Sequence, residues 1–374
     1  MSKNILYVGL DVHKESIDVA LAPGSSTEIR HYGTVGGDLA SLDRVVRKLR
    51  SDDSELWIAY EAGPCGYEIY RYCRKKNIDC LVVAPSRIPK SPGDRVKTDR
   101  RDAAMLARLL RAGELKGIYV PTEEDEALRD LTRARETAMI HYGRSRKELL
   151  SFLLRNGVVY TGKTTWKQEH LNWLSRISLP LPAQQIVFQE SLHQIQESHQ
   201  RVERFTQQIE QQVELWRWKP VIVALQALRG VRLVVAAGIV AELGDMSRFP
   251  HPRALMCYLG LVTSEYSSGP HRRQGAITKT GNVHVRRLLI EAAWQYIHGP
   301  RVSEIIRKRQ QDLPQPIIDI AWKAQLRLCR KYRRMVLRGK NNKVAAVAVA
   351  RELAAFMWAI HRQVVLKERS MVAA

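Results

Sequence analysis

Four acidic residues of the sequence could together bind a cation. Asp11 lies in the apolar stretch LYVGLDV, and Glu61 ends the apolar run IAYE before a glycine-containing turn. Asp99 and Asp102 are three residues apart in KTDRRDA, so they share one face if a helix begins there. A carboxylate in an apolar strand is costly to bury alone, and a metal ion is one partner that offsets the cost. The four acids therefore suggest a metal site.

These oxygen ligands suit magnesium. Mg²⁺ prefers hard oxygen donors and keeps positions for water and phosphate oxygens. Two ions roughly 4 Å apart can stabilise both the entering and the leaving oxygen of a phosphoryl transfer. We expect two Mg²⁺ ions per active site, with Mn²⁺ as the alternative. Taken singly, each acid is equally explained as a solvated strand end or a helix cap, and for Asp18, Glu68 and Asp94 that interpretation is preferred.

A second group of residues could supply a nucleophile. In the segment EYSSGPHRRQGAITKTGNVHVRR, residues 265–287, Ser267 and Ser268 precede a glycine and are followed by several cations. A hydroxyl in a positive field, with a phosphate brought to it, can be activated for attack. Ser-Ser-Gly-Pro is also an ordinary turn sequence, so both interpretations stand at this point.

The elements that would carry the acids form a recognisable order. Three strands, a helix, a strand, a helix and a last strand are predicted, the strands being residues 5–12, 17–23, 31–36, 56–62 and 79–85. A charged loop follows, and a helix runs from about Asp102 to Gly113. This order predicts an α/β fold, a mixed sheet with helices packed against it as in ribonuclease H-like nucleases. The acids can then converge at one edge of the sheet.

Residues 123–220 change character and are predicted to be a helical linker. A long Arg-rich helix, 128–155, and a second helix are separated by Leu-Pro-Leu-Pro at 179–182. The second helix carries a heptad seam, whose members are Leu192, Ile195, His199, Val202, Thr206, Ile209, Val213 and Trp216. Such a stripe must be covered, in a helical hairpin or a coiled coil. We expect a second copy of the chain to cover it, giving a dimer or tetramer.

Residues 221–374 are expected to form a mostly helical domain with a basic tail. The string LQALRGVRLVVAAGIVAELGD has the helix, glycine turn and helix of a helix-hairpin-helix, a module that presents backbone amides to phosphates. Arg229-Gly230-Val231-Arg232 stands where Pro-Gly-Ile-Gly is typical, so the turn is expected to be less tight. The first domain in this division is residues 1–122.

The charge of the chain points to a polyanion. Sixty Lys and Arg oppose 38 Asp and Glu among 374 residues, which leaves a net charge of +22. Residues 301–374 alone hold 17 basic and 5 acidic side chains. We expect nucleic acid to contact cations near the acids, near the serines and in the tail: Lys97, Arg100, Arg101, Arg272, Arg273, Lys279, Arg286, Arg287, Arg330, Lys331, Arg333 and Arg334.

Other composition features argue against membrane and disulfide-rich classes. Apolar stretches such as 233–241 are too short to span a bilayer, and no charged-then-apolar leader opens the chain. Five cysteines form no CxxC pair, which argues against a zinc ribbon or a disulfide framework. We therefore expect a cytoplasmic protein with free thiols and no membrane partner.

Four strings together resemble a known family. GLDVHKESIDVAL, YEAGPCGY, KTDRRDAAMLARLL and LGLVTSEYSSG followed by GAITKTGNVHVRRLLIEAAW are similar to the transposases of insertion sequence family 110. These are the DEDD transposases related to the pilin-gene-inverting recombinase. The resemblance covers residues 5 to about 300, and the order and spacing of the motifs are specific although each string is modest alone.

The resemblance implies a function and a role for each residue. Residues 1–122 would be a RuvC-like domain, with Asp11, Glu61, Asp99 and Asp102 as the metal ligands of the DEDD set. Ser268 matches the nucleophilic serine, which would join the enzyme covalently to DNA, and Ser267 is the less favoured register. The family implies donor and target DNA as substrates and a noncoding bridge RNA as guide. It also implies a bacterial protein associated with the nucleoid when it acts.

Three alternatives compete with this interpretation. Actin-like sugar kinases begin with similar strands, but the chain shows neither their second Asp-Gly phosphate turn nor their Gly-Gly adenosine loop. A RuvC-like nuclease or Holliday-junction resolvase would use the same four acids without a serine. A non-catalytic nucleic-acid-binding protein would explain the charge but not the acids.

Overall fold

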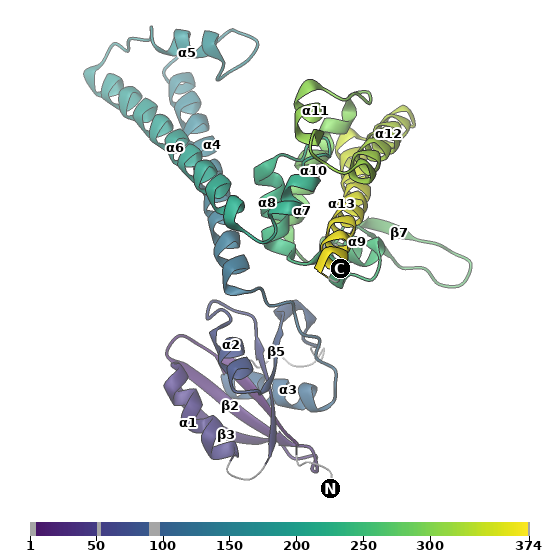
Figure 1. Ribbon diagram of the computed structural model, residues 1–374. Coiled ribbons are helices and arrows are strands. Elements are labelled where there is room, and N and C mark those ends of the chain that lie inside the picture. The colour runs from purple at the N-terminus through teal and green to yellow at the C-terminus, as the bar shows by residue number, and fades with distance from the viewer. Residues whose placement is uncertain (1–4, 51–53, 90–97, 373–374) are drawn as a thin grey trace. The chain divides into compact units, whose positions relative to one another are not determined.

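The computed structural model describes residues 5–50, 54–89 and 98–372, with side chains described as far as residue 366. These residues form two compact units, which divide between Val120 and Pro121. Figure 1 shows a sheet with helices in the first unit and an almost entirely helical second unit. Lys97 and Asp94, which were named from the sequence, lie outside the described residues.

The first unit is built on a five-stranded mixed sheet with the order β3-β2-β1-β4-β5. The first three strands are antiparallel neighbours, and β4 and β5 run parallel to β1. The strands are β1 (Ile5–Val12), β2 (Ser16–Pro23), β3 (Arg30–Gly36), β4 (Glu55–Glu61) and β5 (Asp79–Val83), with helices α1 (Leu39–Arg50), α2 (Glu68–Lys75) and α3 (Asp99–Arg111). The mixed sheet with helices predicted from the sequence is confirmed, and it is consistent with a ribonuclease H-like domain.

Several boundaries differ from the prediction, and two of them lie near the acids. The last strand ends at Val83 because Pro85 begins a short 3-10 helix, Pro85–Arg87, and proline cannot donate to a sheet. Helix α3 begins at Asp99 and not at Asp102, because Thr98 caps it by accepting a hydrogen bond from the backbone N–H of Arg101. Asp99 and Asp102 therefore both lie in the first turn of α3.

Alternating side chains divide the sheet into two covered faces. Leu10 on β1 and Tyr60 on β4 belong to a core that also contains residues of α1 and α2. On the opposite face Ala59 packs with Leu106 and Leu109 of α3. Asp11 and Glu61 are one residue beyond Leu10 and Tyr60, so both fall on the face that α3 covers.

Helix α3 approaches β1 through a glycine. A Cβ atom on Gly9 would lie 2.1 Å from the backbone oxygen of Ala103 and 2.5 Å from the backbone nitrogen of Ala107. Only a residue without a side chain allows the helix backbone this close to the strand. Gly9 is two residues before Asp11 on the same face, and Ala103 directly follows Asp102, so this contact sets how near the acids of α3 come to the strand.

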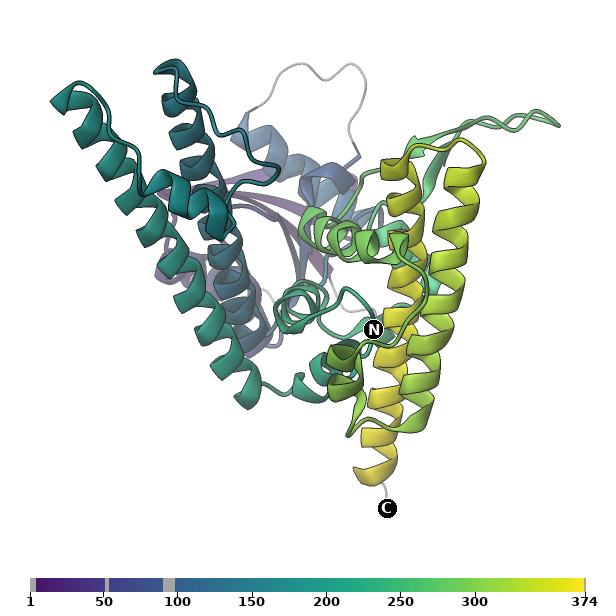
Figure 2. The ribbon, with the colours of Figure 1, turned by 90° about the horizontal axis from the view of Figure 1, so that it is seen from above.

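In the second unit a long helical hairpin precedes a helical bundle. Helices α4 (Glu123–Arg155) and α6 (Pro182–Leu215) lie side by side, with the short helix α5 (Gln168–Leu174) in their connection, as both views show (Figures 1 and 2). The expectation that a second chain covers the heptad seam is wrong. Ile195, Val202 and Ile209 are buried within the single chain, where α6 packs on α4.

The remaining helices enclose one large apolar core. They are α7 (Lys219–Leu225), α8 (Leu233–Leu243), α9 (Pro252–Tyr258), α10 (Val283–Ala293), α11 (Glu304–Gln310), α12 (Gln315–Leu337) and α13 (Asn342–Val372). Each of them except α11 contributes buried side chains to this core. A two-stranded hairpin, β6 (Thr263–Glu265) and β7 (Gln274–Ile277), projects from this bundle (Figure 1). The predicted helical C-terminal region is confirmed.

Helix α13 is longer than the apolar stretches singled out from the sequence. Residues Asn342–Leu366 are long and apolar enough to cross a membrane, and half of the most apolar window is buried in the structure. Val349, Leu353 and Ile360 lie in the core against α7, α9, α10 and α12. These contacts assign α13 to the centre of the bundle (Figure 2).

A buried ionic group ties the hairpin to the bundle. The Glu242 carboxylate, 2% exposed, accepts hydrogen bonds from Arg133 Nε at 2.6 Å and from Asn282 Nδ2 at 2.6 Å. Arg129 lies 3.8 Å away and also donates to the carbonyl of Ala241. Burial alone would raise the pKa of Glu242, but these hydrogen bonds and positive charges outweigh burial and lower it.

We expect Glu242→Gln to lower the free energy of unfolding by about 3 kcal/mol at neutral pH, because it leaves two arginines facing a neutral amide. The folded-state pKa lies below the ordinary value of 4.5, so the stabilisation is present above that value and is lost as pH falls through the folded-state pKa. Urea unfolding across the acidic range measures both effects. The control is Glu304→Gln, an exposed acid paired with Lys308. Equal loss of stability in acid for the Glu242→Gln variant and the unaltered protein would contradict the assignment.

Candidate active site

Two of the predicted ligands occupy equivalent places on neighbouring strands. The parallel register pairs Leu10 of β1 with Tyr60 of β4, so Asp11 and Glu61 are the next residues along each strand. Asp11 is partly buried, whereas Glu61, the last residue of β4, is exposed. Both stand at the carboxyl ends of parallel strands, the edge where α/β sheets place their reactive groups.

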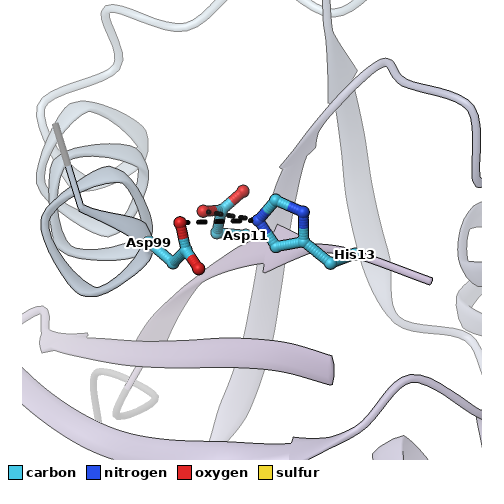
Figure 3. A group of neighbouring side chains, drawn as sticks. All are labelled: Asp11, His13 and Asp99. Carbon is cyan, nitrogen blue, oxygen red and sulfur yellow. Dashed lines mark hydrogen bonds and ion pairs between the residues drawn. The ribbon is translucent and has the colours of Figure 1, made fainter. Parts of the chain in front are cut away.

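The start of α3 adds two more acids to this edge. Asp11 Oδ2 lies 3.3 Å from His13 Nε2, and Asp99 Oδ1 lies 3.6 Å from the same nitrogen. Figure 3 shows the two carboxylates turned toward the imidazole ring from the strand and from the helix. One ligand atom from each of these three residues lies within 4.8 Å of the others. They form a compact set of donors.

The electrostatics of Asp11 show that negative charge is crowded here. Burial raises the pKa of Asp11, and the nearby carboxylates of Asp99 and Asp102 raise it further, against the opposing effect of His13. Asp102 is therefore also close enough to act on Asp11. A site in which burial and like charges both disfavour ionisation is one that a cation would relieve. The donor set thus fits a divalent metal ion.

His13 is the site residue that was not predicted from the sequence. It directly follows the last residue of β1, two residues after Asp11, and its ring returns to the Asp11 carboxylate. The sequence Asp-Val-His at residues 11–13 could have indicated His13 as a ligand, but a search restricted to acidic residues does not include it. Glu61 is brought level with Asp11 by the register and is not part of the group of three ligand atoms found among the described residues.

The acids not assigned to the metal site have structural environments. Asp18, on the strand next to Asp11, accepts hydrogen bonds from His31 Nε2 and from the hydroxyl of Thr34, both at 3.0 Å. These partners hold the carboxylate between β2 and β3. Glu68 is exposed in the first turn of α2.

The serines lie in the second unit, at the end of the β6–β7 hairpin. The Ser267 hydroxyl donates to Glu265 Oε1 at 2.9 Å and accepts from the backbone N–H of Arg273 at 3.2 Å. Ser268 is exposed in the turn itself, and its backbone carbonyl accepts from the N–H of His271. Gly269 takes the left-handed conformation, φ +56°, that closes this turn. The hydroxyl of Ser267 is thus engaged within the hairpin, and that of Ser268 is presented at its tip.

The predicted nucleic-acid-binding cations fall into two groups. In the first group, backbone carbonyls or acids already hold the side chain. Arg286 donates to the carbonyls of Leu259 and Thr280, at 2.9 and 2.8 Å. Arg287 pairs with Glu136 and Glu291, Lys331 pairs with Glu352, and Arg272 pairs with Glu265.

The second group is exposed to solvent. It includes Arg273 and Lys279 beside the serines, and Arg100 in the first turn of α3. Arg101, in the same turn, is also exposed. On α12, Arg330, Arg333 and Arg334 line a groove of about 420 Å³.

Two family models match the chain. Residues 8–156 match the model of the DEDD transposases of the IS110 family, which covers the sheet and the acids. Residues 223–307 match the model described as the transposase IS116/IS110/IS902 family, which covers the serine hairpin.

Relatives that match along most of the chain agree with these models. A putative transposase, y4qE, of Sinorhizobium fredii is 43% identical over 96% of this chain and 88% of its own length. The transposase for insertion sequence element IS1533 of Leptospira borgpetersenii is 31% identical over 89% of this chain and 97% of its own length. A probable family 20 transposase of Pseudomonas aeruginosa is 27% identical over 63% of this chain and 70% of its own length. The chain therefore belongs to the IS110 family of DEDD transposases, enzymes that cut and recombine DNA.

Proposed function

We propose that this transposase cleaves DNA with a metal site formed by the acids around Asp11, and that the cut strand is held as a phosphodiester to the Ser268 hydroxyl before it is rejoined. The observation that carries the proposal is the convergence of Asp11, His13 and Asp99, from a strand and a helix, with ligand atoms within 4.8 Å. The raised pKa of Asp11 supports it, because the cause is burial together with neighbouring carboxylates. Such a site is suited to hold a cation and phosphate oxygens.

Asp11, Glu61, Asp99 and Asp102 would hold the metal, which we propose to be two Mg²⁺ ions, with Mn²⁺ as the alternative. When bound, these ions would neutralise charge on the phosphate and on the leaving oxygen. The carboxylates fit hard cations, and the His13 imidazole adds a nitrogen donor that suits Mn²⁺ better than Mg²⁺. The chain's own contribution is to fix these donors on β1, β4 and α3, of which β1 and α3 are in backbone contact at Gly9.

Ser268 would act as the nucleophile. Its Oγ would form a bond to phosphorus while the bond from phosphorus to a deoxyribose oxygen breaks, and the hydroxyl proton would balance the proton that the leaving oxygen gains. A phosphodiester to serine conserves the energy of the broken bond, so rejoining needs no ATP. Both serines are exposed, and the hydrogen bonds that engage the hydroxyl of Ser267 support Ser268 over its neighbour.

We further propose a noncoding bridge RNA as guide and donor and target DNA as substrates, bound by a homo-oligomer. The resemblance of the motifs supports the RNA, and the net charge of +22 supports a large phosphate surface. The covered seam of α6 offers no support for assembly through that stripe. We also propose the functional division into a DEDD domain, 1–122, a helical linker, 123–220, and a serine-bearing domain, 221–374.

We expect Asp11→Asn, Glu61→Gln, Asp99→Asn and Asp102→Asn each to abolish cleavage of a DNA end while DNA binding survives. An amide keeps the shape of the side chain but loses the charge that holds a divalent cation. Cleavage gels with Mg²⁺ or Mn²⁺ and binding by fluorescence anisotropy in EDTA measure the two effects. The matched control is Glu68→Gln, an exposed acid of the same unit. Full activity in any two of the four variants would overturn the metal assignment.

We expect Ser268→Ala to bind DNA normally but to form no covalent protein–DNA adduct. Denaturing gels with labelled DNA, before and after protease treatment, detect the adduct. Ser267→Ala is the matched control and keeps the adduct. An adduct that persists in Ser268→Ala would identify another nucleophile. Cleavage by the unaltered protein with free ends and no adduct would favour a RuvC-like nuclease that uses water.

We expect the triple variant Arg330→Ala, Arg333→Ala, Arg334→Ala to weaken DNA binding and to flatten its salt dependence. Each lost duplex phosphate contact lowers the slope of log affinity against log salt by about 0.9. Anisotropy titrations across salt concentrations measure the slope. Lys331→Ala is the control on the same helix, because that ammonium is bonded to Glu352 at 2.6 Å and is mostly buried. An unchanged slope in the triple variant would show that this face of α12 does not contact DNA.

A further inference from the structure

The turn between α7 and α8 borders a cavity that the proposed function does not use. Arg229 and Arg232 of this turn, Arg309 of α11 and Ser303 at the start of α11 line a space of about 330 Å³. Its other walls come from α8, from α10 and Gln295 beyond its end, and from the first turn of α11. This is the turn whose sequence resembles a helix-hairpin-helix with two arginines at unusual positions.

The turn is held rigidly against its neighbours. Gly230 has φ +80°, and a Cβ atom there would lie 2.4 Å from the carbonyl oxygen of Ala292 on α10. Arg309 donates to the carbonyl of Val231 at 2.6 Å, and the buried amide of Gln310 donates to that of Ala227 at 3.1 Å. The cavity is therefore formed before any ligand binds.

The cavity carries an excess of positive charge. Arg229 donates a hydrogen bond to the backbone carbonyl of Gly299 at 2.8 Å. This acceptor is uncharged, so it does not neutralise the guanidinium. Arg232 is exposed, and no acid pairs with its guanidinium among the described residues. Glu291 also lines the cavity, but its carboxylate is bonded to Arg287 at 2.7 Å. Burial and the neighbouring Arg232 lower the pKa of Arg309, so the cations crowd one another.

The polarity of α8 adds to this field. The helix begins directly after Arg232, and no side chain caps its first turn. Its first backbone N–H groups have no partner within the helix, and the helix dipole favours an anion at this end. Backbone N–H groups and helix N-termini are common contacts to DNA phosphates. Here guanidinium groups stand at both ends of the turn and supply charge as well.

We infer that this cavity binds a backbone phosphate of duplex DNA, with Arg232 as the principal contact and Arg229 and Arg309 as flanking charges. The inference rests on the proposed action on DNA and adds a contact made by residues other than the acids and the serine. Guanidinium groups match phosphate oxygens in geometry and stay charged at all working pH values. A phosphate of the DNA backbone carries no sequence information. The site would therefore fix the position of the DNA on the protein and would not select its sequence.

The test is DNA binding by Arg232→Ala in EDTA, measured by anisotropy on a labelled 30-base-pair duplex (a length of about three helical turns) across salt concentrations. Loss of one charged contact should weaken binding on the order of tenfold. The salt slope should fall by about 0.9, the value for one duplex phosphate. Arg232→Lys keeps the charge and should restore most of the affinity. The midpoint of thermal unfolding should stay unchanged, because Arg232 is exposed.

The matched control is Lys308→Ala on α11, which removes an exposed cation that does not line the cavity. Equal weakening by Lys308→Ala would show a general charge effect and overturn the site, as would an unchanged slope in Arg232→Ala. The same titrations with duplex RNA form a second arm, and loss confined to RNA would overturn the assignment to DNA. Failure of the unaltered protein to bind or cut DNA would instead overturn the proposed function on which the site rests.

Discussion

The backbone of α3 lies directly on β1 at Gly9, and the candidate active site depends on this contact. A side chain at Gly9 would collide with backbone atoms of Ala103 and Ala107, which cannot move aside as a flexible side chain would. Because the helix cannot be lifted without losing the apolar packing of Leu106 and Leu109, its first turn is fixed beside the end of the strand. The distance between acids of the strand and acids of the helix is therefore set by the core and not by the acids themselves.

That constraint holds like charges together at a cost. Burial and the carboxylates of Asp99 and Asp102 raise the pKa of Asp11, and His13 offsets only part of the effect. A structure selected for stability alone would place a cation or an apolar residue here. Glu242 in the second unit shows that alternative, since two arginines and an amide lower its pKa and the group ties helices together. The contrast separates an acid whose charge the fold compensates from an acid whose charge burial and neighbouring carboxylates disfavour.

The sheet, the approach of Asp99 to Asp11 and the two long helices of the linker could be predicted from the sequence, because each depends on local periodicity and on strand ends. The start of α3 was placed too late, since the cap at Thr98 is one polar side chain in a charged loop. His13 was missed because only acids were considered as ligands. The α6 seam was assigned to a second chain because the sequence of an apolar stripe does not show whether the same chain or another chain covers it. In the structure α4 packs on α6 within the same chain and Val202 is buried. The role of Ser268 stays a prediction, since a hydroxyl at a turn has the same local sequence whether or not it reacts.

Counting basic residues also overstates the surface open to nucleic acid. A guanidinium group has a fixed set of N–H donors. The N–H groups that already donate to carbonyls or carboxylates within the fold are not available to a phosphate. Arg286 donates to the carbonyls of Leu259 and Thr280, and Arg287 pairs with two acids, although both lie in the basic stretch that contains the serines, residues 265–287. Arg232 lies in an apolar segment that drew no attention for its charge, yet it borders a preformed cavity without an acidic partner among the described residues. Phosphate contacts are therefore expected at arginines whose N–H groups have no acceptor within the fold, and not simply where arginines are most frequent in the sequence.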